Sequence, residues 1–230
     1  MSDIFRFKQF SVRHRDSAMK VGTDGVLLGA WVRIPEQTAV IHDVGSGTGL
    51  IGLMLAQRVP AARVIGFELD AASAREGQEN MAMSPFADRC SMIPGRWQDA
   101  GDVELADLMV SNPPFYHIHA GMPDGARKQA RQETELGPEN LFKLSYERST
   151  EKASMAIVWP SDRLDEALHW SSASGWKLWR QTLVKGRKST NRALLQWSKE
   201  PRELEQNTMA IHEGNSHSPE HRELTKDFYL

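Results

Sequence analysis

The chain has 230 residues, of which 40% are hydrophobic and 25% are charged. This composition and length indicate a globular protein with a sizeable core, and exclude a disordered chain or one made of membrane-spanning segments. Because 28 basic residues face 30 acidic ones, for a net charge of −2, the overall charge gives no sign of nucleic-acid binding, which would need locally clustered basic residues.

Strands and helices alternate along the chain after residue 38. Apolar runs predict strands over residues 39–44, 63–68, 90–93, 106–111 and 153–159. Periodic patterns predict helices over residues 49–58, 71–82, 138–151 and 161–174. Two further apolar stretches, residues 176–185 and 193–198, indicate an antiparallel strand pair at the end of the chain's sheet. The sequence therefore predicts one α/β domain, with a mostly parallel seven-stranded sheet covered by helices on both faces.

The first predicted strand leads into a glycine-rich turn. Asp43 stands before the turn and Ser46 lies within it; its glycines are Gly45, Gly47 and Gly49. Strand, glycine turn and helix form the context in which a ligand approaches the backbone at a helix N-terminus. The G-x-G-x-G spacing differs from the G-x-G-x-x-G of dinucleotide binders, which disfavours a nicotinamide or flavin cofactor. Asp43 could hold the turn or contact the amino group of a cofactor.

An acidic residue and a proline-rich tetrapeptide follow two later strands. Glu68 ends the second strand, about 20 residues beyond the turn, where an acid can bind ribose hydroxyls. Residues 112–115 read Asn112, Pro113, Pro114 and Phe115. An amide oxygen, a backbone carbonyl and an aromatic face suit a planar molecule that carries an exocyclic amine. Taken alone, the tetrapeptide could equally be a structural turn.

With the glycine turn and Glu68, the tetrapeptide gives the chain a family resemblance. It resembles the S-adenosylmethionine-dependent amino-methyltransferases, which carry Asn-Pro-Pro-aromatic after the fourth strand. Residues 5–10, 18–25, 28–31 and 224–230 resemble one subfamily, the bacterial tRNA1(Val) (adenine-37-N6)-methyltransferases. The resemblance implies a Rossmann-like class I methyltransferase fold, S-adenosylmethionine as cofactor and tRNA as substrate. It implies no metal, no membrane, no obligate protein partner and a cytoplasmic location, which the lack of an apolar N-terminal signal also favours.

The resemblance also assigns roles to residues. It assigns cofactor binding to the glycine turn, Asp43, Ser46, Glu68 and Asn112. It also places Lys20, Thr23 and Asp24 near the amino-acid end of the cofactor. Asn112 and Pro113 would accept the amine hydrogens of adenine, and Phe115, after Pro114, would stack on the base. Residues 1–38 would fold over the cofactor, residues 39–200 would form the core, and residues 201–230 would be an extension. One departure is Arg96, which stands where relatives often have an acid for the cofactor's adenine; Asp99 is the nearest substitute.

Basic clusters supply the candidate contacts to RNA phosphates. They comprise Arg127, Lys128 and Arg131 after the tetrapeptide, and Lys185, Arg187, Lys188 and Arg192 between the two last strands. Four other interpretations compete with the tRNA enzyme. The tetrapeptide also fits a methyltransferase acting on rRNA or on a protein glutamine amide. A nucleotide-binding regulator is disfavoured by the intact Asn112 and Pro113, and an oxidoreductase by the glycine spacing.

Overall fold

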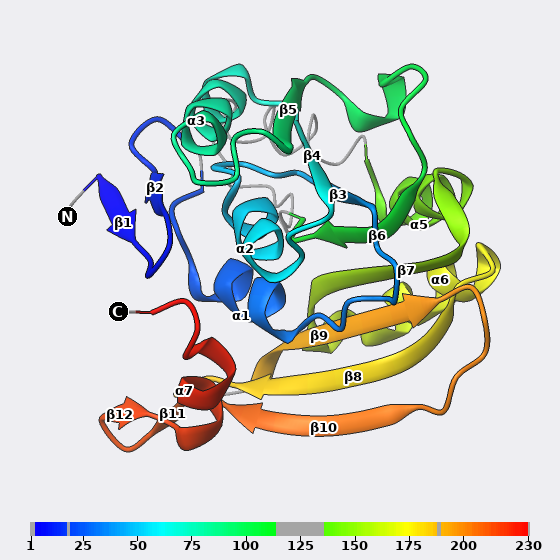
Figure 1. Ribbon diagram of the computed structural model, residues 1–230. Coiled ribbons are helices and arrows are strands. Elements are labelled where there is room, and N and C mark those ends of the chain that lie inside the picture. The colour runs from blue at the N-terminus through cyan, green and yellow to red at the C-terminus, as the bar shows by residue number, and fades with distance from the viewer. Residues whose placement is uncertain (1–2, 18, 114–135, 188–189, 230) are drawn as a thin grey trace, which may run out of the picture.

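The computed structural model describes residues 3–17, 19–113, 136–187 and 190–229 (Figure 1). Six of the predicted site residues lie outside this set: Pro114, Phe115, Arg127, Lys128, Arg131 and Lys188. No helix within the described residues is long and apolar enough to cross a membrane.

A twisted central sheet organises the molecule, with strand order β10-β8-β9-β7-β6-β3-β4-β5. Five parallel strands form one part of it: β3 (Val40–Val44), β4 (Arg63–Glu68), β5 (Cys90–Pro94), β6 (Ala106–Ser111) and β7 (Ser149–Pro160). Strand β9 (Thr190–Ser198) is antiparallel to both β7 and β8 (Lys177–Lys185). This confirms the predicted α/β fold and its antiparallel strand pair.

The structure corrects two details of the predicted elements. The sheet has eight strands rather than seven, because β10 (Glu205–Ala210) pairs in parallel with β8. The predicted helix over residues 138–151 ends earlier: α5 covers Pro138–Glu147, and β7 begins at Ser149. The polar start of β7 resembles a helix surface in sequence, but its backbone pairs with β6 from Ala106 onward.

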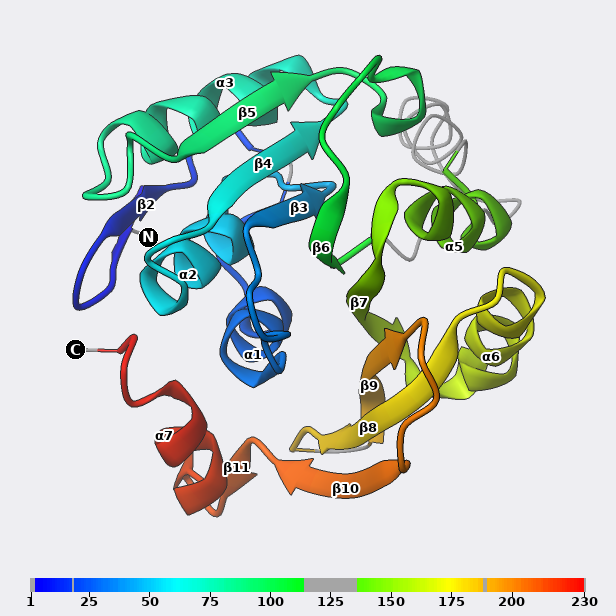
Figure 2. The ribbon, with the colours of Figure 1, turned by 45° about the vertical axis from the view of Figure 1, so that its right-hand side comes forward.

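Helices cover both faces of the sheet (Figure 2). Helices α1 (Thr23–Trp31), α2 (Leu50–Arg58) and α3 (Ala71–Ala82) pack on one face, in a core that includes Leu53, Val64 and Leu108. On the other face lie α5 and α6 (Leu164–Ala173), around Phe142, Met155 and Trp197. Short 3₁₀ turns η1 (Trp97–Asp99) and η2 (Ser161–Arg163) follow β5 and β7.

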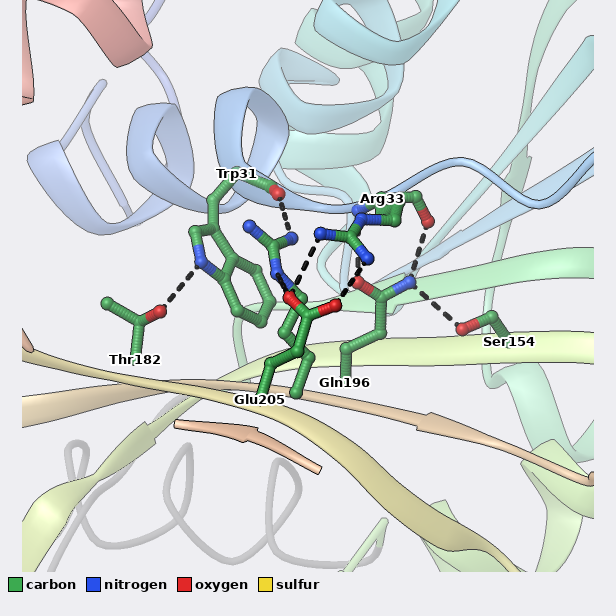
Figure 3. Close-up of polar contacts among 7 residues, drawn as sticks. Trp31, Arg33, Ser154, Thr182, Gln196 and Glu205 are labelled. Atoms are coloured by element: carbon green, nitrogen blue, oxygen red, sulfur yellow. Dashed lines mark hydrogen bonds and ion pairs between the residues drawn. The ribbon is translucent and has the colours of Figure 1, made fainter. Parts of the chain in front are cut away.

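A network of polar contacts joins the C-terminal end of helix α1 to strands β8 and β9 (Figure 3). The Trp31 indole donates to Thr182 Oγ1 at 2.9 Å, and the Arg180 guanidinium lies 4.2 Å from the Trp31 ring centroid. Buried Gln196 accepts from the Arg33 amide at 2.9 Å and donates to the Arg33 carbonyl at 2.6 Å. Residues that precede the first sheet strand are thus held by β8 and β9.

The segments nearest the two ends of the chain lie side by side. Strands β1 (Ile4–Arg6) and β2 (Ser11–Arg13) form a hairpin, and the last helix is α7 (Pro219–Thr225), preceded by the small pair β11 (His212–Glu213) and β12 (Ser216–His217). The Lys8 amide donates to the Phe228 carbonyl at 2.8 Å, and the rings of Phe7 and Tyr229 stack with centroids 6.1 Å apart. Phe228 itself is buried.

Candidate active site

A cavity of about 490 Å³ opens at the carboxyl ends of the parallel strands. Strand β3 lies between β4 and β6, so the chain order reverses here, and such switch points are where open α/β sheets bind ligands. Each parallel strand sends residues to the wall, and α1 and α5 contribute their first turns. The lining includes Thr23, Gly45, Glu68, Gln98, Asn112, Pro138 and Trp159.

The glycine turn forms one wall of this cavity. Gly45 and Gly47 have φ values of +70° and +54°, which L side chains rarely adopt, and a Cβ on either would meet no described atom within 4 Å. The turn therefore leaves its backbone open to a ligand. Gly49 does not line the cavity; a Cβ there would approach the Met81 side chain of α3, so this glycine serves the packing of α2 on α3.

Asp43 holds the turn from beneath. Its Oδ2 accepts from Ser46 Oγ at 2.7 Å and from the Gly52 amide at 2.9 Å, and the whole side chain is buried. Burial raises the Asp43 pKa to about 6, although both hydrogen bonds act in the opposite direction. Since Asp43 is not among the described residues that line the cavity, the geometry favours the turn-holding role over contact with a cofactor.

Glu68 presents a carboxylate to the cavity with its position fixed by backbone amides. Oε2 accepts from the Gly47 amide and Oε1 from the Asp70 amide, both at 2.8 Å. Burial raises the pKa of this carboxyl, while the two amides oppose the shift. Each oxygen retains capacity for another hydrogen bond, which suits the paired hydroxyls of a ribose.

The predicted N-terminal contributors also line the cavity, but with their charges already engaged. The Lys20 ammonium donates to the backbone carbonyls of His14 and Arg15. Asp24 accepts from Arg192 Nε at 2.8 Å, an ion pair between α1 and β9. Arg192, which was predicted to contact RNA, thus bonds a carboxylate of the cavity wall through its Nε.

Asn112 and Pro113 lie at the end of β6 and line the cavity together with the glycine turn and Glu68. Ser111 Oγ donates to the Val44 carbonyl at 2.7 Å, which ties the end of β6 to the end of β3. One cavity thus joins the amide and carbonyl of the tetrapeptide to the proposed ribose acid. Lys185 and Arg187 lie apart from it, exposed at the end of β8.

The end of β5 supplies Gly95, Arg96, Trp97 and Gln98 to the wall, whereas the described residue Asp99 does not reach it. Among the described residues, the end of β5 therefore places no acid in the cavity wall. Trp97 fills two roles at once, because its side chain is buried in the core and also lines the cavity.

Sequence reasoning missed the wall contributed by β7 and the turn after it. Trp159 and Arg163 line the same cavity as Asn112 and Pro113, and the Arg163 guanidinium lies 5.6 Å from the Trp159 ring centroid. A Trp at the carboxyl end of a predicted parallel strand is a signal that could have found this wall, because all such ends meet at one edge of the sheet.

Comparisons with known proteins identify relatives of this chain. The family described as "Methyltransferase small domain" matches residues 19–132. The chain is 38% identical to the tRNA1(Val) (adenine(37)-N6)-methyltransferase of Porphyromonas gingivalis, over 99% of this chain and 95% of the relative. It is 36% identical to the enzyme of the same name from Pectobacterium carotovorum, over 99% and 94%. A crystal structure from Agrobacterium tumefaciens, described as a predicted O-methyltransferase, shares the fold with a TM-score of 0.69 at 17% identity, covering 89% of this chain and 96% of that one.

Proposed function

Because the chain belongs to the tRNA1(Val) (adenine(37)-N6)-methyltransferase family, we propose that it transfers a methyl group from S-adenosylmethionine to the N6 amine of an adenine in tRNA. The expected target is adenine 37 in the anticodon loop of valine tRNA. One observation carries the proposal: Asn112 and Pro113 share a single cavity with the glycine turn and Glu68. Binding a nucleotide alone would not require an amide and a bare carbonyl at that position.

The cavity fits S-adenosylmethionine. The open backbone at Gly45 and Gly47 admits the methionine part, and the Glu68 carboxylate accepts the two ribose hydroxyls. Thr23 and Asp24 border the same space from α1. When bound, the cofactor supplies an electrophilic methyl group on a positively charged sulfur.

Asn112 and Pro113 prepare the target amine. Its lone pair is conjugated into the adenine ring, which makes it a poor nucleophile. Asn112 Oδ1 and the Pro113 carbonyl accept its two hydrogens and favour a pyramidal nitrogen with an exposed lone pair. Positioning and these two acceptors provide the catalysis, and no strong general base is required, because the nitrogen becomes acidic only once it is methylated.

The substrate class is tested by a single-turnover assay with labelled methyl cofactor. Unmodified valine tRNA, rRNA fragments and a glutamine-containing peptide are offered separately, and the tRNA product is digested and analysed by mass. Of the three substrates, we expect only the tRNA to be methylated, with N6-methyladenosine as the product. A tRNA whose adenine 37 is replaced by guanine should not be methylated. Methylation of the rRNA or the peptide instead would assign the enzyme to one of the two alternative substrates.

A further inference from the structure

The order of the strands divides the cavity into two sides. Its wall follows the carboxyl ends of β5, β4, β3, β6 and β7 in that spatial order. Glu68 and the glycine turn lie at the ends of β4 and β3, so the proposed cofactor occupies the β3–β5 side. Asn112 at the end of β6 marks the reacting position. The target nucleotide therefore lies toward β7, beside Trp159 and Arg163.

Arg163 is built to meet an anion at this side. Its Nε and Nη2 atoms lie 2.9 and 2.6 Å from Glu166 Oε2, and its planar group lies over the Trp159 ring. The Trp159 indole also donates to the Arg163 carbonyl at 2.8 Å, which fixes the turn that carries the guanidinium. The side chain is 27% exposed, and its Nη1 has no hydrogen-bond partner among the described residues.

Acidic residues flank Arg163 on its own turn and on α6, namely Asp162, Asp165 and Glu166, while basic residues lie on the neighbouring strand connection. Pro160, which precedes η2, stands opposite Arg192 in the register of β7 and β9. The turn therefore begins beside the connection between β8 and β9, near which Lys185 and Arg187 are exposed. An RNA backbone that leaves the cavity on this side would run from Arg163 toward these residues.

On this geometry, and resting on the proposed function, we propose that Arg163 binds a backbone phosphate next to the target adenosine. The guanidinium holds the strand while the base enters between Asn112 and the β7 wall. Glu166 orients the arginine without using all of its donors, and five fixed N–H groups allow one guanidinium to bridge a carboxylate and a phosphate.

The test compares Arg163→Ala with Arg63→Ala. Arg63 is also ion-paired, but it lies at the amino end of β4, away from the carboxyl ends that form the cavity. Affinity for unmodified valine tRNA is measured over a salt series, and cofactor affinity is measured by calorimetry. We expect Arg163→Ala to weaken tRNA binding about tenfold, as for one lost charge-assisted contact, and to lower the salt slope by about 0.7, as for one phosphate contact on a single strand. Arg63→Ala should change neither quantity.

A third variant separates a phosphate contact from a structural support. Glu166→Gln removes the charge that neutralises Arg163 and leaves the guanidinium in place, so tRNA binding should tighten or stay unchanged. If Arg163→Ala binds tRNA with wild-type affinity and slope, or if cofactor affinity falls in parallel with tRNA affinity, the proposal is overturned. The wild-type protein is assayed for tRNA methylation alongside the variants. If it methylates tRNA while Arg163→Ala binds tRNA normally, the Arg163 proposal fails and the proposed function stands.

Discussion

At the scale of single residues, Asn112 carries the chemistry of the proposed reaction. Its hydrogen bond strengthens as the target nitrogen becomes pyramidal, so its loss acts mainly on the methyl-transfer step. We expect Asn112→Ala to lower the single-turnover rate about 100-fold, the effect of removing one preorganised hydrogen-bonding group. Asn207→Ala, on the exposed edge strand β10, is the matched control. A near wild-type rate for folded Asn112→Ala would make the tetrapeptide a structural turn.

Buried His42 links stability to pH. It lies in β3, fully buried and edge-on to Phe67 with ring centroids 5.0 Å apart. Burial lowers its pKa from 6.5 to about 4. Between these values the unfolded chain binds a proton that the folded chain does not, so stability is lost as the pH falls through this window.

His42→Leu should remove this component of the pH dependence. The window of about 2.5 pKa units corresponds to about 3 kcal/mol of unfolding free energy between pH 7 and pH 4. Urea unfolding of both proteins at several pH values measures it, and the difference between variant and wild type should grow in the variant's favour as the pH is lowered. Parallel pH profiles would show that His42 is protonated equally in both states.

At the scale of elements, the attachment of α1 to the late strands depends on Gln196. Its side chain satisfies both backbone groups of Arg33 and also donates to Ser154 Oγ (Figure 3). Gln196→Leu leaves the partly buried backbone groups of Arg33 and the buried Ser154 hydroxyl without this partner, and we expect a loss of about 1–3 kcal/mol in unfolding free energy. The exposed Arg33–Glu205 ion pair is the control, because Glu205→Gln should cost under about 1 kcal/mol. If Gln196→Leu and Glu205→Gln lost the same unfolding free energy, burial would not explain the contribution of Gln196.

Sequence patterns located elements whose signal is local. Helix α3 and strands β4 and β6 have the predicted bounds, because an Asp70 cap or an apolar run marks each of them. Strand β10 was missed because its residues are mostly polar and lack an apolar run, and backbone pairing with β8 alone defines it. The same holds for the site. The glycine turn and Glu68 could be predicted from local motifs, whereas the Asp24–Arg192 pair could not, because it joins residues 168 positions apart.

At the scale of the whole molecule, the two ends of the chain share one hydrophobic core. Phe228 packs in the same cluster as Phe7, Phe10 and α1. We expect Phe228→Ala to lower the unfolding free energy by about 3 kcal/mol, at the low end for a buried phenylalanine. Trypsin should then cleave faster after Arg6, Lys8 and Arg13. Leu204→Ala, at an exposed leucine, should leave both stability and cleavage unchanged; equal cleavage in the two variants would show that Phe228 does not secure the first hairpin.

The attachment of α1 has a consequence for synthesis on the ribosome. Thr23 and Asp24 complete the cavity wall, yet their helix is held by Thr182, Gln196 and Arg192, which are added more than 150 residues later. A nascent chain can form the early strands and the glycine turn while translation continues, since chains fold from the N-terminus as they emerge. The polar contacts that join α1 to the late strands therefore form only after β9 has left the exit tunnel, whereas the packing of α1 on α2 uses residues that are made early.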